Sequence, residues 1–168
     1  MKSMRSILVA VFFTLFIGMA IVYTACKKDH CNNVICQNGG ACDGGNCTCL
    51  AGFEGNRCQT LSRTKFIYTF NGGDTCSSND SVYNQYPIKF LTISTNPVEM
   101  NMKNILNNMD DSAVCTMQSP DSFSFSGSNN STTYYGYGTL SNDTLRLVYH
   151  VQHDTTSYNC AYFGGIFL

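Results

Sequence analysis

Charged residues are scarce in this chain of 168 residues. Lysine and arginine together number 10, aspartate and glutamate 11, and the formal net charge is −1. No basic cluster follows the pair Lys27-Lys28, so no segment is positive enough to neutralise a row of phosphates. The low charge therefore excludes nucleic acid as an expected partner. Asn, Ser, Thr and Gly supply the polarity instead, and these weak helix formers favour extracellular β structure.

The residues and motifs of common catalytic sites are also scarce. Histidine occurs three times, at His30, His150 and His153, and the motifs HExxH, GxSxG and the Walker-type phosphate loop are absent. On a strand His150 and His153 point to opposite faces, which disfavours a shared metal ion unless the strand ends between them. The adjacent carboxylates Asp110-Asp111 are interpreted as a solvated turn. We therefore expect no enzyme, no cofactor and no metal site.

The first 25 residues have the pattern of a secretion signal. Lys2 and Arg5 give a positive start, an uncharged apolar run extends over Ile7–Val22, and small residues follow. The run is short for a membrane-spanning helix. The next residue is Cys26, and the segment Val22–Cys26 resembles a bacterial lipoprotein processing box, with Tyr23 in place of the usual leucine.

This resemblance implies a signal peptide over residues 1–25, cleaved before Cys26, whose sulfur then carries diacylglycerol, with palmitate among the expected acyl chains. The polar residues 27–29 resemble those of surface-exposed lipoproteins of some Gram-negative bacteria. Several acyl chains on one residue hold a protein at a membrane, whereas one chain binds only marginally. Residues 26–30 are then a lipidated tether at the outer membrane or cell surface. The alternative is an ordinary signal peptide with Cys26 as a spare thiol.

Six of the ten cysteines lie within Cys31–Cys58. So short a segment cannot bury a sizeable apolar core, so cross-links must replace it. Such disulfides persist in an oxidising space, which places the chain outside the cytoplasm. A zinc site is the alternative for clustered cysteines, but no CxxC pair is present and the spacing fits zinc poorly. Six cysteines allow fifteen connectivities, and spacing alone does not choose among them.

The spacing of these six cysteines resembles that of an epidermal-growth-factor-like (EGF-like) module over residues 31–58. Cys47-Thr48-Cys49 followed by Gly55 and Cys58, with Gly52-Phe53 in the intervening turn, fits the end of the family signature. The resemblance implies three disulfides, which are Cys31–Cys42, Cys36–Cys47 and Cys49–Cys58. EGF-like modules serve many roles, so the resemblance does not by itself fix the function.

Some EGF-like modules bind calcium through acidic and amide residues that precede the first cysteine. This chain has Lys28-Asp29-His30 there, with basic residues where oxygen ligands are needed. Asp29, Asn32 and Asp43 supply three candidate ligands, whereas Ca²⁺ takes about six to eight oxygens. We therefore expect the module to fold without calcium.

Residues 59–64 are expected to form a short linker, and residues 65–168 an all-β domain. Apolar and polar residues alternate there in short runs, the pattern of half-buried strands. The predicted strands are Phe66–Phe70, the segments 88–93, 98–103, 113–118, 123–125, 134–139 and 145–151, and Tyr158–Phe167. Turn-rich clusters include Asn71–Asp74 and Ser141–Asp143, and Asn104–Asp111 has room for one helical turn. This rhythm predicts an antiparallel all-β domain, either a sandwich or a small barrel.

Three cysteines, Cys76, Cys115 and Cys160, belong to this β domain. Several bacterial lipoproteins follow an EGF-like module with a β domain that has one cysteine after its first strand and another before its last, and Cys76 and Cys160 resemble these two. If the first and last strands are neighbours, the two sulfurs come within bridging distance. Cys115 shares a strand face with Ala113 and Met117, where a small apolar thiol packs unpaired. We therefore expect a Cys76–Cys160 disulfide and a free Cys115.

Aromatic residues provide the remaining candidate surface. Tyr134, Tyr135 and Tyr137 lie in one predicted strand, with Tyr83 and Tyr86 elsewhere. Exposed aromatics on a sheet bind carbohydrate rings or protein partners. The alternative is that half of them fill the core while the rest pack across strands.

Together these features predict a membrane-anchored binding or structural protein of the cell surface, with an EGF-like spacer and a β-rich head. Its expected partners are the membrane, through the lipid anchor, and a protein or glycan ligand. One alternative is a lipocalin-like carrier of a small apolar ligand, which needs a barrel with a lumen. Another is a secreted EGF-like receptor ligand, which needs a cleaved N-terminus without lipid.

Replacing Cys26 by serine is expected to release the protein from membranes, because the substitution removes the sulfur that carries the acyl chains. Membrane fractionation measures the release, and the intact mass of the mature wild-type chain should show acyl groups on an N-terminal Cys26. A mature chain that begins at any other residue contradicts the prediction.

Overall fold

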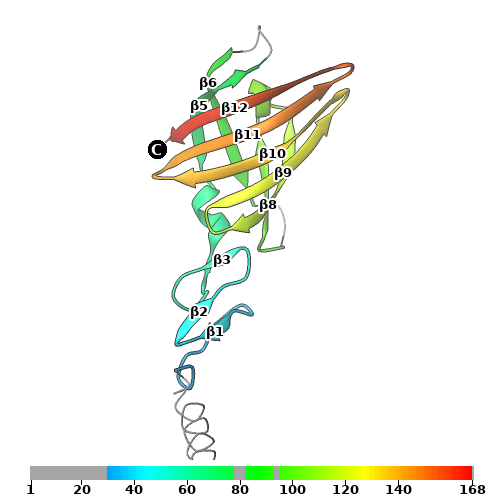
Figure 1. Cartoon of the computed structure of the whole chain (residues 1–168). Coiled ribbons are helices and arrows are strands. Elements are labelled where there is room, and N and C mark those ends of the chain that lie inside the picture. Colours follow the sequence, from blue (N-terminus) through cyan, green and yellow to red (C-terminus); the bar gives the residue numbers. More distant parts are fainter. Residues whose placement is uncertain (1–29, 78–81, 93–94, 168) are drawn as a thin grey trace, which may run out of the picture.

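The computed structural model describes residues 30–77, 82–92 and 95–167, which form a disulfide-rich segment followed by a β-barrel (Figure 1). The predicted signal peptide and Cys26 lie outside these residues. Within the described ranges, no helix has the length and apolar character needed to cross a membrane.

Residues 30–58 form the disulfide module. In it β1 (Ala41–Asp43) pairs with β2 (Asn46–Thr48), and the turn glycines Gly44 and Gly45 have φ of 55° and 93°, which glycine adopts without steric cost. β3 (Phe53–Glu54) pairs with β4 (Thr60–Leu61), just beyond the module. The disulfides are Cys31–Cys42, Cys36–Cys47 and Cys49–Cys58, the same pairs that the resemblance implied.

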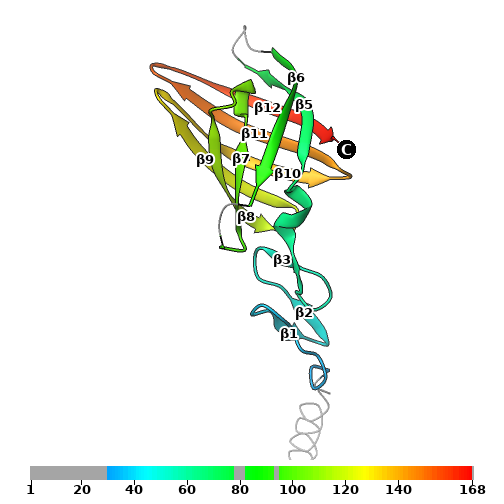
Figure 2. The ribbon, with the colours of Figure 1, turned by 180° about the vertical axis from the view of Figure 1, so that it is seen from behind.

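Eight antiparallel strands form a closed barrel after the module. They are β5 (Thr69–Cys76), β6 (Val82–Leu91), β7 (Glu99–Lys103), β8 (Ser112–Ser119), β9 (Ser122–Asn129), β10 (Thr132–Ser141), β11 (Thr144–His153) and β12 (Thr156–Ile166). Each strand pairs with the next along the chain, and β12 pairs with β5 to close the ring. Strands β9–β12 cross the front of Figure 1, and β5–β7 face the viewer in Figure 2. The prediction of an antiparallel all-β domain is confirmed. Of the two predicted architectures, sandwich and small barrel, the barrel is correct.

Tight turns join the long strands of the barrel. Between β10 and β11, Asn142 and Asp143 have φ of 48° and 59°, the left-handed region that two-residue hairpin turns require and that Asn and Asp tolerate. Asn130, before β10, and Asp154, before β12, adopt the same backbone with φ of 48° each. The predicted turn at Ser141–Asp143 is therefore confirmed. It forms because Asn142 and Asp143 tolerate the left-handed backbone that the turn requires.

Two predictions near the start of the barrel are wrong. Of the predicted strand Phe66–Phe70, only the last two residues are in a strand. Phe66 ends a 3₁₀ helix, η1 (Ser62–Phe66), and β5 begins at Thr69. The predicted turn Asn71–Asp74 lies inside β5. A Cβ at Gly72 would collide with the carbonyl oxygen of Phe163 on β12, and a bulge follows between Gly72 and Asp74. Glycine there permits a close backbone approach and does not mark a chain reversal.

Inward-pointing aromatic and aliphatic side chains fill the barrel. The rings of Phe66 and Phe123 meet edge to face with centroids 5.2 Å apart, and those of Phe90 and Phe123 lie 5.5 Å apart. Phe66 extends from η1 into the end that faces the module, and it is fully buried. At the far end of β7, the predicted helical turn in Asn104–Asp111 is present as η2 (Ile105–Asn107), whose Ile105 is also fully buried. Both ends of the core are thus covered.

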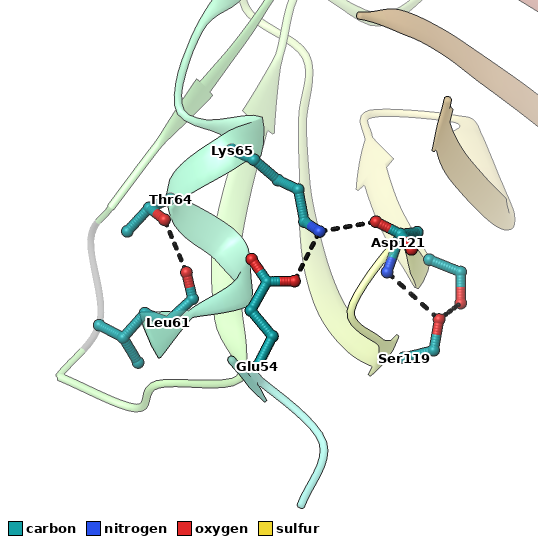
Figure 3. A network of polar contacts seen from close by, with 7 residues as sticks. Glu54, Leu61, Thr64, Lys65, Ser119 and Asp121 are labelled. Atoms are coloured by element: carbon teal, nitrogen blue, oxygen red, sulfur yellow. Dashed lines mark hydrogen bonds and ion pairs between the residues drawn. The ribbon is translucent and has the colours of Figure 1, made fainter. Parts of the chain in front are cut away.

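A charged residue of η1 connects the disulfide module to the barrel. Lys65 Nζ lies 2.7 Å from Glu54 Oε2 in the module and 2.6 Å from Asp121 Oδ1 in the β8–β9 turn (Figure 3). Burial alone lowers the pKa of Lys65, but hydrogen bonds to Asp121 and Glu54 raise it overall, so the amine stays charged. Because these groups are partly exposed, the ion pairs orient the two parts more than they stabilise them.

Backbone contacts complete this junction. The predicted linker, residues 59–64, contains β4 and the start of η1. The amide of Ser62 donates to the carbonyl oxygen of Gly52, 2.9 Å away. Gly52 lies against the β6–β7 connection, where an added Cβ would come within 2.6 Å of Val98 Cγ1. The buried Arg63 donates from Nη1 to the carbonyl oxygens of Asn96, at 2.5 Å, and Glu99, at 2.7 Å, in the same region.

A fourth disulfide, Cys76–Cys160, joins β5 to β12, and Cys115 is a buried free thiol among the described cysteines. The disulfide closes a loop with a sequence separation of 84 residues. In the chain-entropy model such a loop stabilises the fold by roughly 4–5 kcal/mol. Cys76→Ala and Cys160→Ala are therefore expected to lower the free energy of unfolding by similar amounts, with little further loss in the double variant.

Urea denaturation of these variants measures the effect, with Cys115→Ala as the matched control. Removing one buried sulfur without breaking a cross-link should cost only about 1 kcal/mol. A control variant as unstable as the two disulfide variants would contradict the prediction, as would a bridge to Cys115 in non-reducing peptide maps.

Candidate binding site

The barrel interior holds a buried carboxylate, Asp74 on β5, at 2% exposure. The hydroxyl of Tyr86 donates to its Oδ2, and the ring of Tyr86 packs against that of Tyr162 with centroids 5.3 Å apart. Burial raises the pKa of Asp74 above its ordinary value because the charged form is desolvated, and the hydrogen bond from Tyr86 offsets only part of this. Burial raises the pKa of Tyr86 and Tyr149 as well, so both hydroxyls stay protonated.

This buried polar cluster has the properties of a structural network. Tyr86, Tyr149 and Tyr162 are at most 3% exposed, so solvent and ligands do not reach the carboxylate. The hydroxyl of Tyr162 donates to the carbonyl oxygen of Phe70, 2.8 Å away, which ties the last strand to the first. The cluster therefore supports barrel closure, and the candidate binding surface must lie elsewhere.

The outer face of β8–β12 carries two cross-strand rows of side chains. The first row is Val114, Ser126, Tyr135, His150 and Asn159. The second row is Thr116, Ser124, Tyr137, Val148 and Ala161. Neighbouring positions within a row lie about 5 Å apart, the spacing of paired strands. The rows thus run side by side across five strands.

An open groove of about 630 Å³ lies over these rows, and we call it the tyrosine groove. Tyr135 and Tyr137 on β10 are 58% and 56% exposed and line one side. Val114 on β8, 52% exposed, lines the other. The small residues Ser124 and Ser126 of β9 lie between them, so the groove follows β9 because serine leaves space where larger side chains flank it.

Neighbouring side chains hold the groove residues in place. The ring of His150 lies beside Tyr135 with centroids 5.3 Å apart, and a 3.0 Å hydrogen bond joins His150 Nδ1 to Asn159 Oδ1. Gln118 Nε2 donates to Ser124 Oγ over 3.0 Å. These contacts fix side chains before any ligand arrives, which lowers the entropy cost of binding.

The chemistry of the tyrosine groove suits binding better than catalysis. Ser126 and His150 are separated by the strand that carries Tyr135, so they lie about 10 Å apart, beyond the reach of proton transfer between nucleophile and base. Among its described lining residues, none is Lys, Arg, Asp or Glu. The groove therefore offers aromatic rings, hydroxyls and amides without formal charge.

A second hollow, of about 750 Å³, lies where η1 meets the β10–β11 turn. It contains Lys65 and Asp121 of the junction together with Tyr68 and Asp143. Because Lys65 and Asp121 of its lining already pair with each other, this hollow is explained by the contact of η1 with the β8–β9 turn.

The structure separates the tyrosines that the sequence places together. Tyr134 points inward, and its hydroxyl donates to the carbonyl oxygen of Ser112, 2.9 Å away. Burial raises its pKa to about 12. Tyr135 and Tyr137 point outward and form the groove with Ser124 and Ser126, which sequence reasoning missed. The available signal was the alternation of these serines with the buried Phe123 and Phe125.

The other candidate groups do not form a site. His150 belongs to the tyrosine groove. The ring of His153 instead forms a 2.6 Å hydrogen bond between its Nδ1 and Thr132 Oγ1. Across the described ranges, no three His, Cys, Asp or Glu residues are grouped so as to hold a metal ion. The interpretation of Asp110-Asp111 as a solvated turn is wrong for Asp111, which is buried and accepts a 2.5 Å hydrogen bond from Asn129 Nδ2.

Comparisons with family models, with curated proteins and with solved structures found no match to this chain. The four disulfides indicate an extracytoplasmic protein, since such bonds persist in oxidising compartments. The functional argument therefore depends on the chemistry of the barrel surface and on this compartment.

Asp74→Asn is expected to stabilise the barrel at pH 8 and to lose this advantage towards pH 3. The folded state raises the pKa of Asp74, so it favours the protonated carboxyl, and wild-type stability declines as the pH rises through that folded pKa. The asparagine variant carries no charge to desolvate and can still accept the hydrogen bond from Tyr86.

Thermal unfolding across this pH range measures the difference between wild type and variant. The exposed Asp110→Asn serves as the control for a general loss of negative charge. The prediction is wrong if the advantage of Asp74→Asn is largest at acid pH, or if Asp110→Asn reproduces it.

Proposed function

We propose that this protein is a lipid-anchored binding protein of the outer membrane or cell surface. Acylated Cys26 is the anchor, an EGF-like module over residues 31–58 is the spacer, and the barrel is the binding head. The observation that carries the proposal is the contrast between the two sides of the barrel wall. The inner side is packed with buried side chains, while the outer side bears the open tyrosine groove.

The packed interior disfavours the lipocalin-like carrier. A carrier needs a lumen and an entrance. Here the rings of Phe66, Phe90 and Phe123 pack against one another with centroids 5.2–6.2 Å apart inside the barrel. Phe66 also covers the end near the module, and Ile105 covers the other end. An apolar ligand would have to displace these aromatic rings. Each ring contributes strongly to stability, since truncating a buried Phe to Ala typically costs about 3–5 kcal/mol of the free energy of unfolding.

The junction between module and barrel supports the role of a spacer. Three cross-links make the module stiff. Lys65 and Ser62 of η1 contact Glu54 and Gly52 of the module, and Arg63 fixes η1 to the barrel. A secreted EGF-like receptor ligand would present the module itself, but here one end of the module is already occupied by the barrel. A stiff spacer instead keeps the outer barrel wall away from the membrane, where ligands are accessible.

The full-length chain, purified in detergent, should bind a ligand on glycan or protein arrays without turning over substrates in a parallel hydrolase panel. The double variant Tyr135→Ala/Tyr137→Ala should lose that binding, because both exposed rings line the groove. A fluorescent fatty acid titrated into the wild-type chain tests the carrier alternative, and we expect no saturable uptake.

The matched control is Tyr68→Ala, because Tyr68 is an exposed tyrosine outside the groove, and this variant should bind like the wild type. Array binding that survives the double variant would place the binding surface elsewhere. Turnover that disappears with a single His or Asp substitution would replace the proposal with an enzyme.

A further inference from the structure

We infer that the tyrosine groove binds a neutral polysaccharide, with successive sugar rings laid along the groove. This inference rests on the proposed function and names the ligand class of the same surface. It follows from four features of the groove: the geometry of the two tyrosines, the polar groups beside them, the lack of charged lining residues and the open shape.

The two tyrosines form a stacking surface. Tyr135 and Tyr137 occupy alternate positions of β10, so their side chains leave the same face of the sheet about 7 Å apart. Both are more than half exposed. A pyranose ring has a face of C–H groups and an edge of hydroxyls, and the C–H face packs favourably on an aromatic ring. Two neighbouring rings therefore suit two parts of one chain of sugars.

Groups that match the hydroxyl edge of a sugar lie beside these rings. Ser124 and Ser126 are cross-strand partners of Tyr137 and Tyr135, and Thr116 pairs with Ser124 on the next strand. Asn159 lies at the other end of the Tyr135 row. Each hydroxyl can donate and accept, and each amide does both with separate atoms, so the set complements sugar hydroxyls.

The absence of charge selects a neutral polymer. The described lining residues of the groove include no Lys, Arg, Asp or Glu. A polysaccharide with carboxylate or sulfate groups would lose hydration in the groove without gaining a counter-charge, which is unfavourable. The hollow at the junction differs in this respect, because it contains Lys65, Asp121 and Asp143.

The open shape favours a polymer over a small molecule or a protein. Sites for small ligands enclose most of the ligand surface. The tyrosine groove instead lies open on the outer wall of the barrel, where it follows β9 between the two tyrosines of β10 and Val114 of β8. A stable protein interface typically buries about 800 Å² of surface on each partner, around an apolar core. Here Val148 lies beside Tyr137, whereas the exposed Val114 is separated from both tyrosines by serines.

Binding is measured on a sensor that carries the full-length chain through a C-terminal tag. The probes are soluble neutral polysaccharides, namely mixed-linkage β-glucan, xylan, mannan and starch, and two anionic ones, polygalacturonate and heparin. At least one neutral probe should bind, and the anionic probes should not. Tyr135→Ala/Tyr137→Ala should weaken that binding about tenfold or more, as expected from the loss of two stacking contacts.

Two controls test the stacking itself. Tyr135→Phe/Tyr137→Phe keeps both rings and should stay within about threefold of the wild type, and Tyr68→Ala should have no effect. Circular dichroism checks that each variant remains folded. We expect it to, because the substituted side chains are exposed and fill no part of the core. The inference is overturned if no neutral probe binds, if only the anionic probes bind, or if the alanine double variant binds like the wild type.

The outcomes also separate this inference from the proposed function. If a protein on the arrays binds through Tyr135 and Tyr137 while every neutral polysaccharide fails, the barrel is a binding head but its ligand is not a glycan. If neither a glycan nor a protein depends on the two tyrosines, both statements fail.

Discussion

Closure of the barrel by β12 and β5 is the constraint on which the rest of the structure depends. Once the first and last strands pair, every strand has one inner and one outer face, and side chains must alternate between them. The closure is reinforced three times, by the backbone ladder, by the Cys76–Cys160 disulfide and by the hydrogen bond from Tyr162 to Phe70. Because the enclosed volume is filled with buried side chains, many of them aromatic, the proposed binding surface lies on the outer wall.

The same closure explains how the module attaches to the barrel. A closed barrel needs a cover at each end, and η1 supplies one by placing Phe66 in the core. The residues around Phe66 in η1 are then fixed at the barrel end, so Arg63 and Lys65 can reach the β6–β7 connection and the β8–β9 turn. The segment that joins the two domains is therefore also part of the barrel, which makes the junction stiff without a large interface.

The sequence predicts the parts of this structure that depend on local pattern or on cysteine pairing. Period-two alternation located most strands, and the expectation that the first and last strands are neighbours led to the Cys76–Cys160 pairing, which the structure contains. It did not predict that Phe66 belongs to η1 and that β5 starts only at Thr69, nor that β5 runs through Asn71–Asp74, because a glycine that permits a close approach to Phe163 resembles a glycine of a turn. Nor did it predict the tyrosine groove. Alternation shows that Tyr134 and Tyr135 face opposite sides, but the groove also needs the register that places Ser126 beside Tyr135 and Val114 beyond it, and register is a property of the paired strands.

The scarcity of charge, which first excluded nucleic acid, also follows from the closed barrel. Open sheets commonly need lysines or other charges at their edge strands to prevent pairing with another chain. In this ring each of the eight strands has a partner on both sides for at least part of its length, so fewer such charges are needed and outer positions can carry Ser, Thr and Tyr. On β8–β12 this freedom gives two neutral rows, with Arg146, stacked 5.4 Å from the ring centre of Phe163, beyond them. These two neutral rows carry the hydroxyl and aromatic side chains on which the proposed recognition of an uncharged, hydroxyl-rich ligand rests, so the proposal depends on the same closure that fixes the outer face of the barrel.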